Sequence, residues 1–314
     1  MRIKFGVQFW QEEFDISHLK SAVKEVEEMG FESAWIYDHF YPMSKTTSYN
    51  ILEAWTLLPF LAAATEKIRL GVLVTCNSYR HPSILAKIAT TVDIISKGRL
   101  EFGIGAGWFE EEYDAYGIPF PNAEIRLDQM AEAIVLIKKI WMNEKINFRG
   151  KYYIANDLIS FPKPVQKPHP PIMIGGKGDI LLKIAAQHAD NINLVNCTPE
   201  EYGKRLEVLK NYYEKNGRDY NSITKSWHGQ IIFTEKEKAK KMILKFKENS
   251  RIKNVQETSL EELMNRMIVG TPEECVDRIQ DYNNFGAEYI IPHFPFSDEL
   301  ESERIFIDEI SSCF

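Results

Sequence analysis

Eight short apolar segments recur along the chain, and most are followed by a stretch with the periodicity of an amphipathic helix. This alternation is typical of a parallel sheet whose strands are joined by helices. The segment IRLGVLVT is apolar almost throughout, as in strands that are covered on both faces. The expected strands lie at 3–9, 33–37, 68–75, 100–104, 172–174, 191–195, 230–233 and 288–292.

Eight alternations are the number found in a (β/α)8 barrel, and they favour that fold over its structural rival, an open doubly wound sheet. A chain of 314 residues is long enough for one barrel with an insertion. We therefore expect an α/β fold, a single TIM-barrel domain over residues 1–314. The insertion is expected at approximately 108–171, between strands 4 and 5.

Local signals support the order of elements. Within the expected insertion, a helix is predicted over 125–141, a hairpin is predicted in FRGKYYIAND, and the proline-rich segment 161–171 is predicted to be extended. Gly30 ends the first predicted helix. The motif TPEE at 198–201 and again at 271–274 predicts two capping boxes with proline in the first turn of the helix.

The composition excludes several classes of protein. Apolar runs fall well short of the roughly 18 residues that span a bilayer, and MRIKFGVQFW has no signal-peptide pattern, so we expect a cytoplasmic protein with no membrane partner. A formal net charge of -7 disfavours nucleic acid as a partner. The four cysteines are scattered without a CxxC pair, which argues against structural zinc and disulfides.

The active site of a barrel lies at the carboxyl ends of its strands, so the residues that follow each expected strand are the candidates. Asp38 and His39 form the expected acid/base unit, because histidine titrates near neutral pH and a neighbouring carboxylate can orient it. The other histidines at 81, 169, 188 and 228 are interpreted as structural. A metal-dependent hydrolase is disfavoured, since FGVQFW in the first strand offers no metal ligand.

Two glycine-rich stretches follow expected strands. RLEFGIGAGWFEEE is either the floor of a cofactor site or an ordinary glycine turn, and its GIGAG spacing does not match a Rossmann fingerprint. IGGKGD precedes a helix and is either an anion site or a plain turn. The carboxylates at 110–112 are interpreted as a solvated helix start. Trp108 either packs in the core or lies at the mouth of a cavity.

Five segments together resemble the bacterial luciferase-like monooxygenase superfamily, and more closely its branch of coenzyme F420-dependent oxidoreductases. They are DHF at 38–40, VTCNSYRHP at 74–82, RLEFGIGAGWFEEEYDAYGIPF at 99–120, FPKPVQKPHPPIMIGG at 161–176 and GTPEECVDRIQDY at 270–282. The resemblance implies a barrel that binds F420, or alternatively FMN, at its mouth without metal. It is specific for fold and cofactor class but not for substrate.

The resemblance also implies roles for individual residues. His39 matches the active-site histidine, with Asp38 beside it. Cofactor-binding positions match Leu73 and Val74, where a non-prolyl cis peptide is expected, and Thr75, Asn77, Gly105, Ala106, Gly107, Gly175, Gly176 and Lys177. The expected substrate pocket contains Trp108, Phe9 and His293. Trp108 stands where F420-dependent sugar-phosphate dehydrogenases carry a glutamate, which disfavours a sugar phosphate as substrate.

The leading hypothesis is an oxidoreductase that transfers a hydride between F420 and a small organic substrate. The first alternative is a monooxygenase that uses reduced FMN, and the second is a flavin-binding protein without catalytic activity. A separate reductase that supplies the cofactor is compatible with the two enzymatic hypotheses. The family resemblance further suggests a homodimer or larger homo-oligomer.

Overall fold

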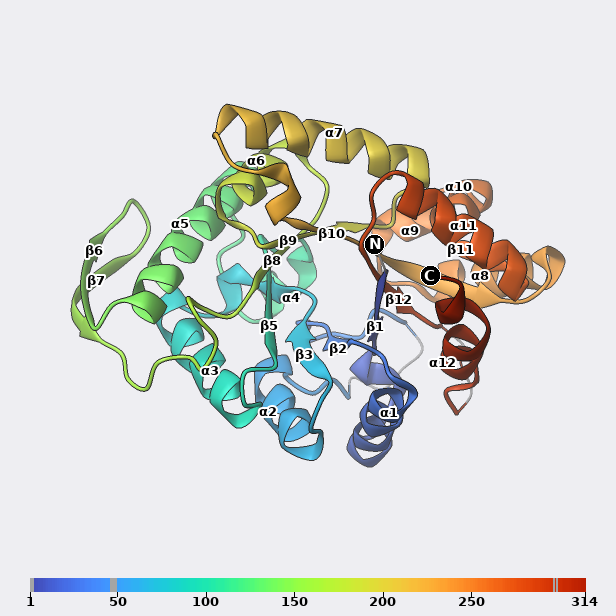
Figure 1. Cartoon of the computed structure of the whole chain (residues 1–314), viewed down its shortest axis with the longest axis horizontal. Helices are drawn as coiled ribbons and strands as arrows, with labels where there is room; N and C mark the ends of the chain where they lie inside the picture. The colour runs from blue at the N-terminus through green and yellow to red at the C-terminus, as the bar shows by residue number, and fades with distance from the viewer. Residues whose placement is uncertain (1–2, 46–49, 296, 298) are drawn as a thin grey trace.

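Eight parallel strands close into a barrel in the computed structural model, which describes residues 3–45, 50–295, 297 and 299–314 (Figure 1). Each strand is hydrogen-bonded to two barrel neighbours, and the pairings of β10 with β9 and with β12 complete the ring. The expected (β/α)8 fold is therefore confirmed. In order around the barrel the strands are β1 (Lys4–Gln8), β2 (Ser33–Ile36), β3 (Arg69–Val72), β5 (Leu100–Gly105), β8 (Ile172–Gly175), β9 (Asn191–Val195), β10 (Thr224–Phe233) and β12 (Tyr289–His293).

Helices surround the barrel, and the main hydrophobic core lies between them and the outer face of the strands. Seven of them follow the barrel strands: α1 (Ile16–Met29), α2 (Ala54–Ala64), α3 (Pro82–Ile95), α5 (Ala123–Met142), α6 (Asp179–His188), α7 (Pro199–Lys215) and α11 (Pro272–Asn284). A second cluster, which includes Trp35, Met173 and Ile291, is contributed by β2, β8 and β12. None of the helices that the described residues form is both long and apolar enough to cross a membrane.

The third expected strand, at 68–75, is interrupted after Val72, although the sequence remains apolar through Val74. β3 ends at Val72, the peptide bond between Leu73 and Val74 is cis, and β4 (Thr75–Cys76) then pairs with β5. The expected non-prolyl cis peptide is thus confirmed.

The seventh expected strand was placed too far along the chain. Residues 224–230 of β10 pair with β9 and β12 in the barrel, whereas residues 231–233 pair with β11 (Ile268–Gly270), which lies off the ring. The barrel part of β10 carries polar residues at alternate positions, Ser226, His228 and Gln230. It therefore lacks the apolar run that marks the other strands.

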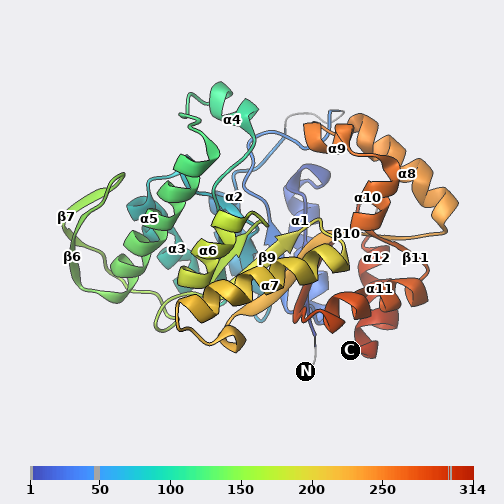
Figure 2. The same ribbon diagram turned by 90° about the horizontal axis from the view of Figure 1, so that it is seen from above.

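The segment between β5 and β8 contains one ordinary barrel helix and two additions. α5 packs against α3 and α6, as the fourth helix of the repeat does. The additions are α4 (Glu110–Ala115) and the predicted hairpin, which is confirmed as β6 (Lys145–Arg149) and β7 (Ile154–Ile159). In Figure 2, α4 lies on the same side of the barrel as α9 (Lys253–Glu257), opposite to the two termini.

The predicted helix signals are present. Thr198 with Glu201, and Thr271 with Glu274, form reciprocal capping boxes at the starts of α7 and α11. Gly30 ends α1 with a φ of 93°, a conformation that glycine adopts without a Cβ clash. After β10, the chain forms α8 (Lys236–Asn249), α9 and α10 (Leu260–Arg266) before it enters β11.

Glycines in the neighbouring strands make room for the Val74 side chain. A Cβ added at Gly105 would lie 2.7 Å from Cγ2 of Val74, and one at Gly175 would lie 2.9 Å from Cγ1. At Gly103, the added atom would meet the carbonyl oxygen of Val72 at 2.2 Å. The absence of a Cβ at Gly103 and Gly105 therefore makes room for the interrupted third strand. A bound group can use only the space that this strand leaves free.

We predict that Gly103→Ala destabilises the protein by about 3 kcal/mol, because the methyl group would collide with rigid backbone. Gly178→Ala is the matched control, since Gly178 has a φ of -74° and no neighbour within 4 Å of an added Cβ. The urea midpoints of the two variants measure the difference. Equal midpoints would contradict the packing described for Gly103.

Candidate active site

A cavity of about 330 Å³ opens at the carboxyl ends of the barrel strands. Predicted site residues that line it are Asp38, His39, Leu73, Val74, Thr75, Gly105, Ala106, Gly107, Trp108, Gly175 and Gly176. Residues that were not predicted to belong to the site complete the lining: Cys76, Tyr79, Leu181, Asn193, Val195 and His228. Segments distant in the sequence thus meet at one place.

Four predicted site residues are not among those that line this cavity: Asn77, Lys177, Phe9 and His293. The amide of Asn77 donates to the hydroxyl of Tyr153, 3.2 Å away. Lys177 lines an adjacent pocket. Phe9 and His293 line a separate cavity between α1 and α12 (Glu301–Ile305), because Phe9 faces outward from the barrel and His293 stacks on Trp10. The structure therefore does not bring these two residues to His39.

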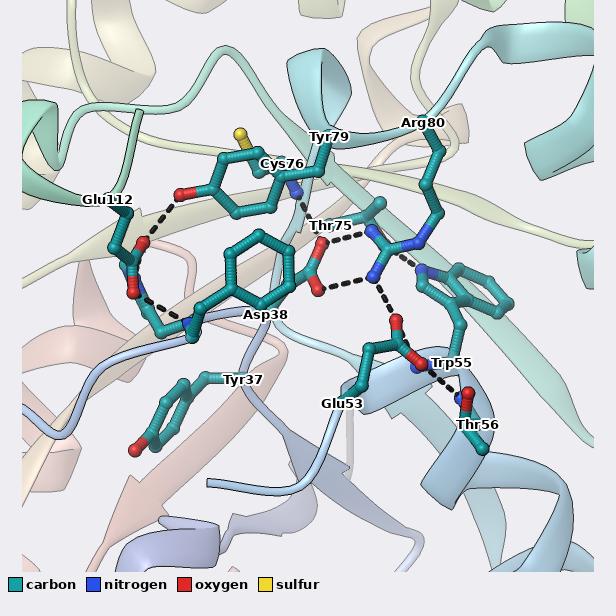
Figure 3. A network of polar contacts seen from close by, with 12 residues as sticks. Tyr37, Asp38, Glu53, Trp55, Thr56, Thr75, Cys76, Tyr79, Arg80 and Glu112 are labelled. Carbon is teal, nitrogen blue, oxygen red and sulfur yellow. Dashed lines mark hydrogen bonds and ion pairs between the residues drawn. The ribbon is translucent and has the colours of Figure 1, made fainter. Parts of the chain in front are cut away.

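A buried carboxylate holds His39. Nδ1 of His39 lies 2.9 Å from Oε2 of Glu112, whose side chain has no exposed surface. The other oxygen of Glu112 accepts hydrogen bonds from the backbone N–H groups of Phe40 and Tyr41 at 2.6 and 2.8 Å, and the Tyr79 hydroxyl donates to Oε2 (Figure 3). An ionised carboxylate only accepts, so Nδ1 carries the proton and Nε2 is left for the cavity.

The ionised state of Glu112 follows from its surroundings. Burial alone would raise the pKa of this carboxyl, but hydrogen bonds from His39, Tyr79 and the Tyr41 backbone, with the charge that His39 can carry, lower it below its usual value. The Glu112 carboxylate beside Nδ1 fixes the orientation of the His39 ring and leaves Nε2 facing the cavity. The pair can therefore take up or release a proton at Nε2 while Glu112 stays ionised.

Asp38 is fully engaged in a polar network. Its two oxygens accept from the Arg80 guanidinium at 2.7 and 2.9 Å, and one also accepts from the backbone N–H of Cys76 at 2.9 Å (Figure 3). Arg80 extends the network to the carboxylate of Glu53. Asp38 was predicted to form the acid/base unit with His39, but both of its oxygens are engaged by Arg80 and the loop after β4, and the carboxylate that contacts His39 is that of Glu112.

The same network fixes the start of α2. Glu53 caps the helix by accepting from the backbone N–H groups of Trp55 and Thr56. The indole N–H of Trp55 donates to the hydroxyl oxygen of Thr75 at 3.1 Å. Helix α2 and the cavity wall at Thr75 are thus held as one unit.

Aromatic side chains form the rim of the cavity next to His39. Trp108 is 50% exposed and stacks on Phe109 with a centroid separation of 5.2 Å. The His39 ring packs edge-on against both, at 5.5 and 5.9 Å. Gly107, with a φ of 78°, leaves room for the Tyr113 hydroxyl beneath this rim. The rim offers a flat apolar surface beside the ring nitrogen of His39.

Two polar side chains, the buried Asn193 and the partly buried His228, face the cavity from the opposite wall. Asn193 donates through Nδ2 to Ser226 at 2.9 Å, whereas its Oδ1 has no hydrogen-bond partner among the described residues. His228 donates through Nδ1 to the carbonyl oxygen of Ile291 at 2.7 Å, and burial lowers its pKa to about 4. His228 is therefore neutral at pH 7, with Nε2 as an acceptor. Both side chains leave an acceptor available to a ligand.

The sequence held signals for the residues that were missed. Phe109, Glu112, Tyr113 and Tyr116 fall at helical spacing, so Glu112 lies on the aromatic face of α4, not on the solvated face assumed for all three glutamates. Asn193 alternates with the apolar residues of β9, which is the pattern of a side chain that faces into a barrel. The partners of these residues come from distant segments, and no local pattern identifies them.

Comparison with known proteins connects this site to one family. The model of the luciferase-like monooxygenase family matches residues 3–289. An F420-dependent glucose-6-phosphate dehydrogenase of Microbacterium testaceum is 28% identical, over 98% of this chain and 96% of that protein. An F420-dependent secondary alcohol dehydrogenase in complex with an F420-acetone adduct superimposes with a TM-score of 0.88 at 20% identity, each chain covered in full. The F420-dependent tetrahydromethanopterin reductase of Methanopyrus kandleri gives 0.84 at 21% identity, again with full coverage of both chains.

We predict that His228→Gln reduces the loss of stability on acidification. In the unfolded chain His228 has a pKa near 6.5, whereas in the folded protein its pKa is about 4. Between these two pH values the unfolded state binds a proton that the folded state does not, so the free energy of unfolding falls as the pH drops through this interval. The full loss from His228 is about 3 kcal/mol. Urea midpoints measured between pH 7 and 4 should fall less steeply in the variant. A slope equal to that of wild type, or an equal effect from the exposed control His18→Gln, would contradict this account.

Proposed function

The chain belongs to the luciferase-like monooxygenase family, and from this premise we propose that it is an F420-dependent oxidoreductase. The reaction is hydride transfer between the deazaflavin and a small organic substrate at the barrel mouth. The observation that carries the proposal is the match, along nearly the whole length of both proteins, with a relative named F420-dependent. Most of the residues that were expected to contact the cofactor line one cavity, and this supports the same conclusion.

The residues of the cavity fit a deazaflavin ring. A volume of about 330 Å³ suits the ring system of such a ligand. The side chains of Leu73 and Val74 give an apolar surface for a flat ring, and Gly105 and Gly175, which make room for Val74, also line the cavity. The Asn193 oxygen without a partner can accept from an N–H group on the polar edge of the ring, which removes the cost of a buried unsatisfied acceptor.

The protein supplies position, exclusion of water and proton transfer. When bound, the deazaflavin supplies the hydride acceptor or donor carbon, C5. Nε2 of His39 accepts the proton of a substrate hydroxyl as the carbon is oxidised, and returns it to a carbonyl oxygen in the reverse direction. Glu112 stabilises the imidazolium that forms, and Trp108 covers the substrate beside it.

The part of the substrate that reacts in this cavity is uncharged. No lysine or arginine is among the described residues that line it. Arg80, which lies behind the wall, is paired with Asp38 and Glu53. A phosphate or carboxylate placed here would face Asp38 without a free cation. The chemistry of the lining therefore suits an alcohol, an aldehyde or a ketone.

We predict that His39→Asn lowers kcat by about 100-fold or more, because the proton donor and acceptor is lost. Glu112→Gln should lower kcat by about tenfold or more, because the carboxylate that orients Nδ1 of His39 and accepts its proton is removed. Turnover is followed as bleaching of the deazaflavin absorbance with the best substrate from a panel of alcohols. Glu110→Gln, an exposed neighbour on the same helix, is the control. An unchanged kcat in Glu112→Gln would remove that residue from the mechanism.

The proposed cofactor is tested by titrating the purified protein with F420 and with FMN and following fluorescence. We expect saturable binding of F420 at micromolar concentration and much weaker binding of FMN. Tight FMN binding without F420 binding would replace the proposal by a flavin-dependent monooxygenase.

A further inference from the structure

We propose that the cavity between α1 and α12, separate from the candidate active site, binds an organic cation: a primary ammonium group on an apolar body. The inference goes beyond the proposed function and does not depend on it. The cavity has a volume of about 670 Å³ and shares no described lining residue with the cavity at His39. Among the described residues that line it are four glutamates but only one lysine or arginine, Arg304.

The buried imidazole of His293 offers this cavity an unused acceptor. Its side chain is 2% exposed, and its Nε2 lies 3.3 Å from Oε2 of Glu13. Because an ionised carboxylate only accepts, Nε2 carries the proton of the neutral ring, and Nδ1 is left as an acceptor. Nδ1 is buried and has no hydrogen-bond partner among the described residues. A ligand N–H group that donates to Nδ1 removes the cost of a buried acceptor without a partner.

Glu303 places a buried carboxyl group in the same cavity. The residue is 4% exposed, and its Oε2 accepts from the Ser297 hydroxyl at 2.6 Å. Burial raises the pKa of this carboxyl, and no lysine or arginine in the described part of the chain forms an ion pair with it. A cation bound beside Glu303 stabilises its ionised form. The carboxyl group therefore favours a positively charged ligand.

The cationic side chains of the lining are engaged elsewhere. Arg304 donates to Glu25 at 2.8 Å, and this contact joins α12 to α1, which lie next to each other in Figure 1. His18 lies at the rim with its side chain 79% exposed and pairs with Asp15 at 2.9 Å. An anionic ligand would meet no unpaired guanidinium among the described residues here, whereas a cation meets the carboxyl group of Glu303.

Aromatic rings favour an organic cation over a metal ion. Phe9 and Phe14 meet edge-on at a centroid separation of 5.6 Å, and Phe294 lines the same cavity. Aromatic faces attract an ammonium group, and the rings also cover the apolar part of an amine. No group of three or more histidine, cysteine, aspartate or glutamate residues within the described ranges is placed to hold a metal ion. A primary amine with an aromatic or aliphatic body therefore matches this lining.

The test compares phenethylamine with its uncharged analogue, phenethyl alcohol, by calorimetry at neutral pH. We expect the wild type to bind the amine at millimolar concentration or below. The alcohol should bind about tenfold more weakly or less, because it lacks the charge that Glu303 attracts.

Three variants locate the binding site. Glu303→Gln keeps an acceptor for Ser297 but removes the charge, and it should weaken amine binding about tenfold or more. Glu301→Gln, at an exposed position of α12 outside the cavity lining, is the control. Ser21→Trp, at the exposed rim on α1, should block the cavity and abolish amine binding without a change in the buried core. Urea midpoints report whether each variant is folded.

The outcomes decide the inference. Weaker amine binding in Glu303→Gln and Ser21→Trp, with wild-type affinity in Glu301→Gln, supports it. If Glu303→Gln does not fold, Ser21→Trp and the comparison of amine with alcohol decide. The inference is overturned if the wild type binds no amine up to about 10 mM, if amine and alcohol bind equally, or if neither Glu303→Gln nor Ser21→Trp alters the affinity. The F420 titration tests the proposed function separately, so either proposal can fail while the other stands.

Discussion

The buried ion pair between Asp38 and Arg80 is the interaction on which the mouth of the barrel depends. It joins the end of β2 to the loop after β4, at the place where the third strand is interrupted, and through Glu53 it reaches the start of α2. Removing one partner of such a pair leaves an uncompensated charge and costs about 3–5 kcal/mol. The ligand cavity thus has a wall whose position is set by charge as well as by packing.

Adjacent residues at the end of β2 have different tasks as a result. Asp38 is saturated by its partners and holds the scaffold, whereas His39 keeps one ring nitrogen free and takes the chemical role in our proposal. Glu112 supports the role of His39, because it accepts a hydrogen bond from Nδ1 and also holds the backbone of the following loop against α4. The short helix α4 after β5 therefore contributes to the site through a carboxylate that does not itself line the cavity.

Much of the fold follows from local pattern, and less of the site does. The alternation of apolar segments and helices gives the barrel, the capping boxes and the hairpin, because these depend on neighbours in the sequence. The seventh strand was misplaced because its residues that face the barrel interior are polar. Glu112 was missed for a related reason: its burial depends on partners about 70 residues away. The glycines near Val74 were interpreted as room for a cofactor, but their first neighbour is that side chain.

The protonation of His39 tests the central claim, that a buried carboxylate orients the active-site histidine. Nitrogen-15 spectra of protein labelled at histidine, with His39 assigned by comparison with a variant that lacks it, report which ring nitrogen carries a proton. We predict that Nδ1 is protonated in both the neutral and the charged ring, because the Glu112 carboxylate only accepts. A neutral ring with its proton on Nε2 and none on Nδ1 would contradict it.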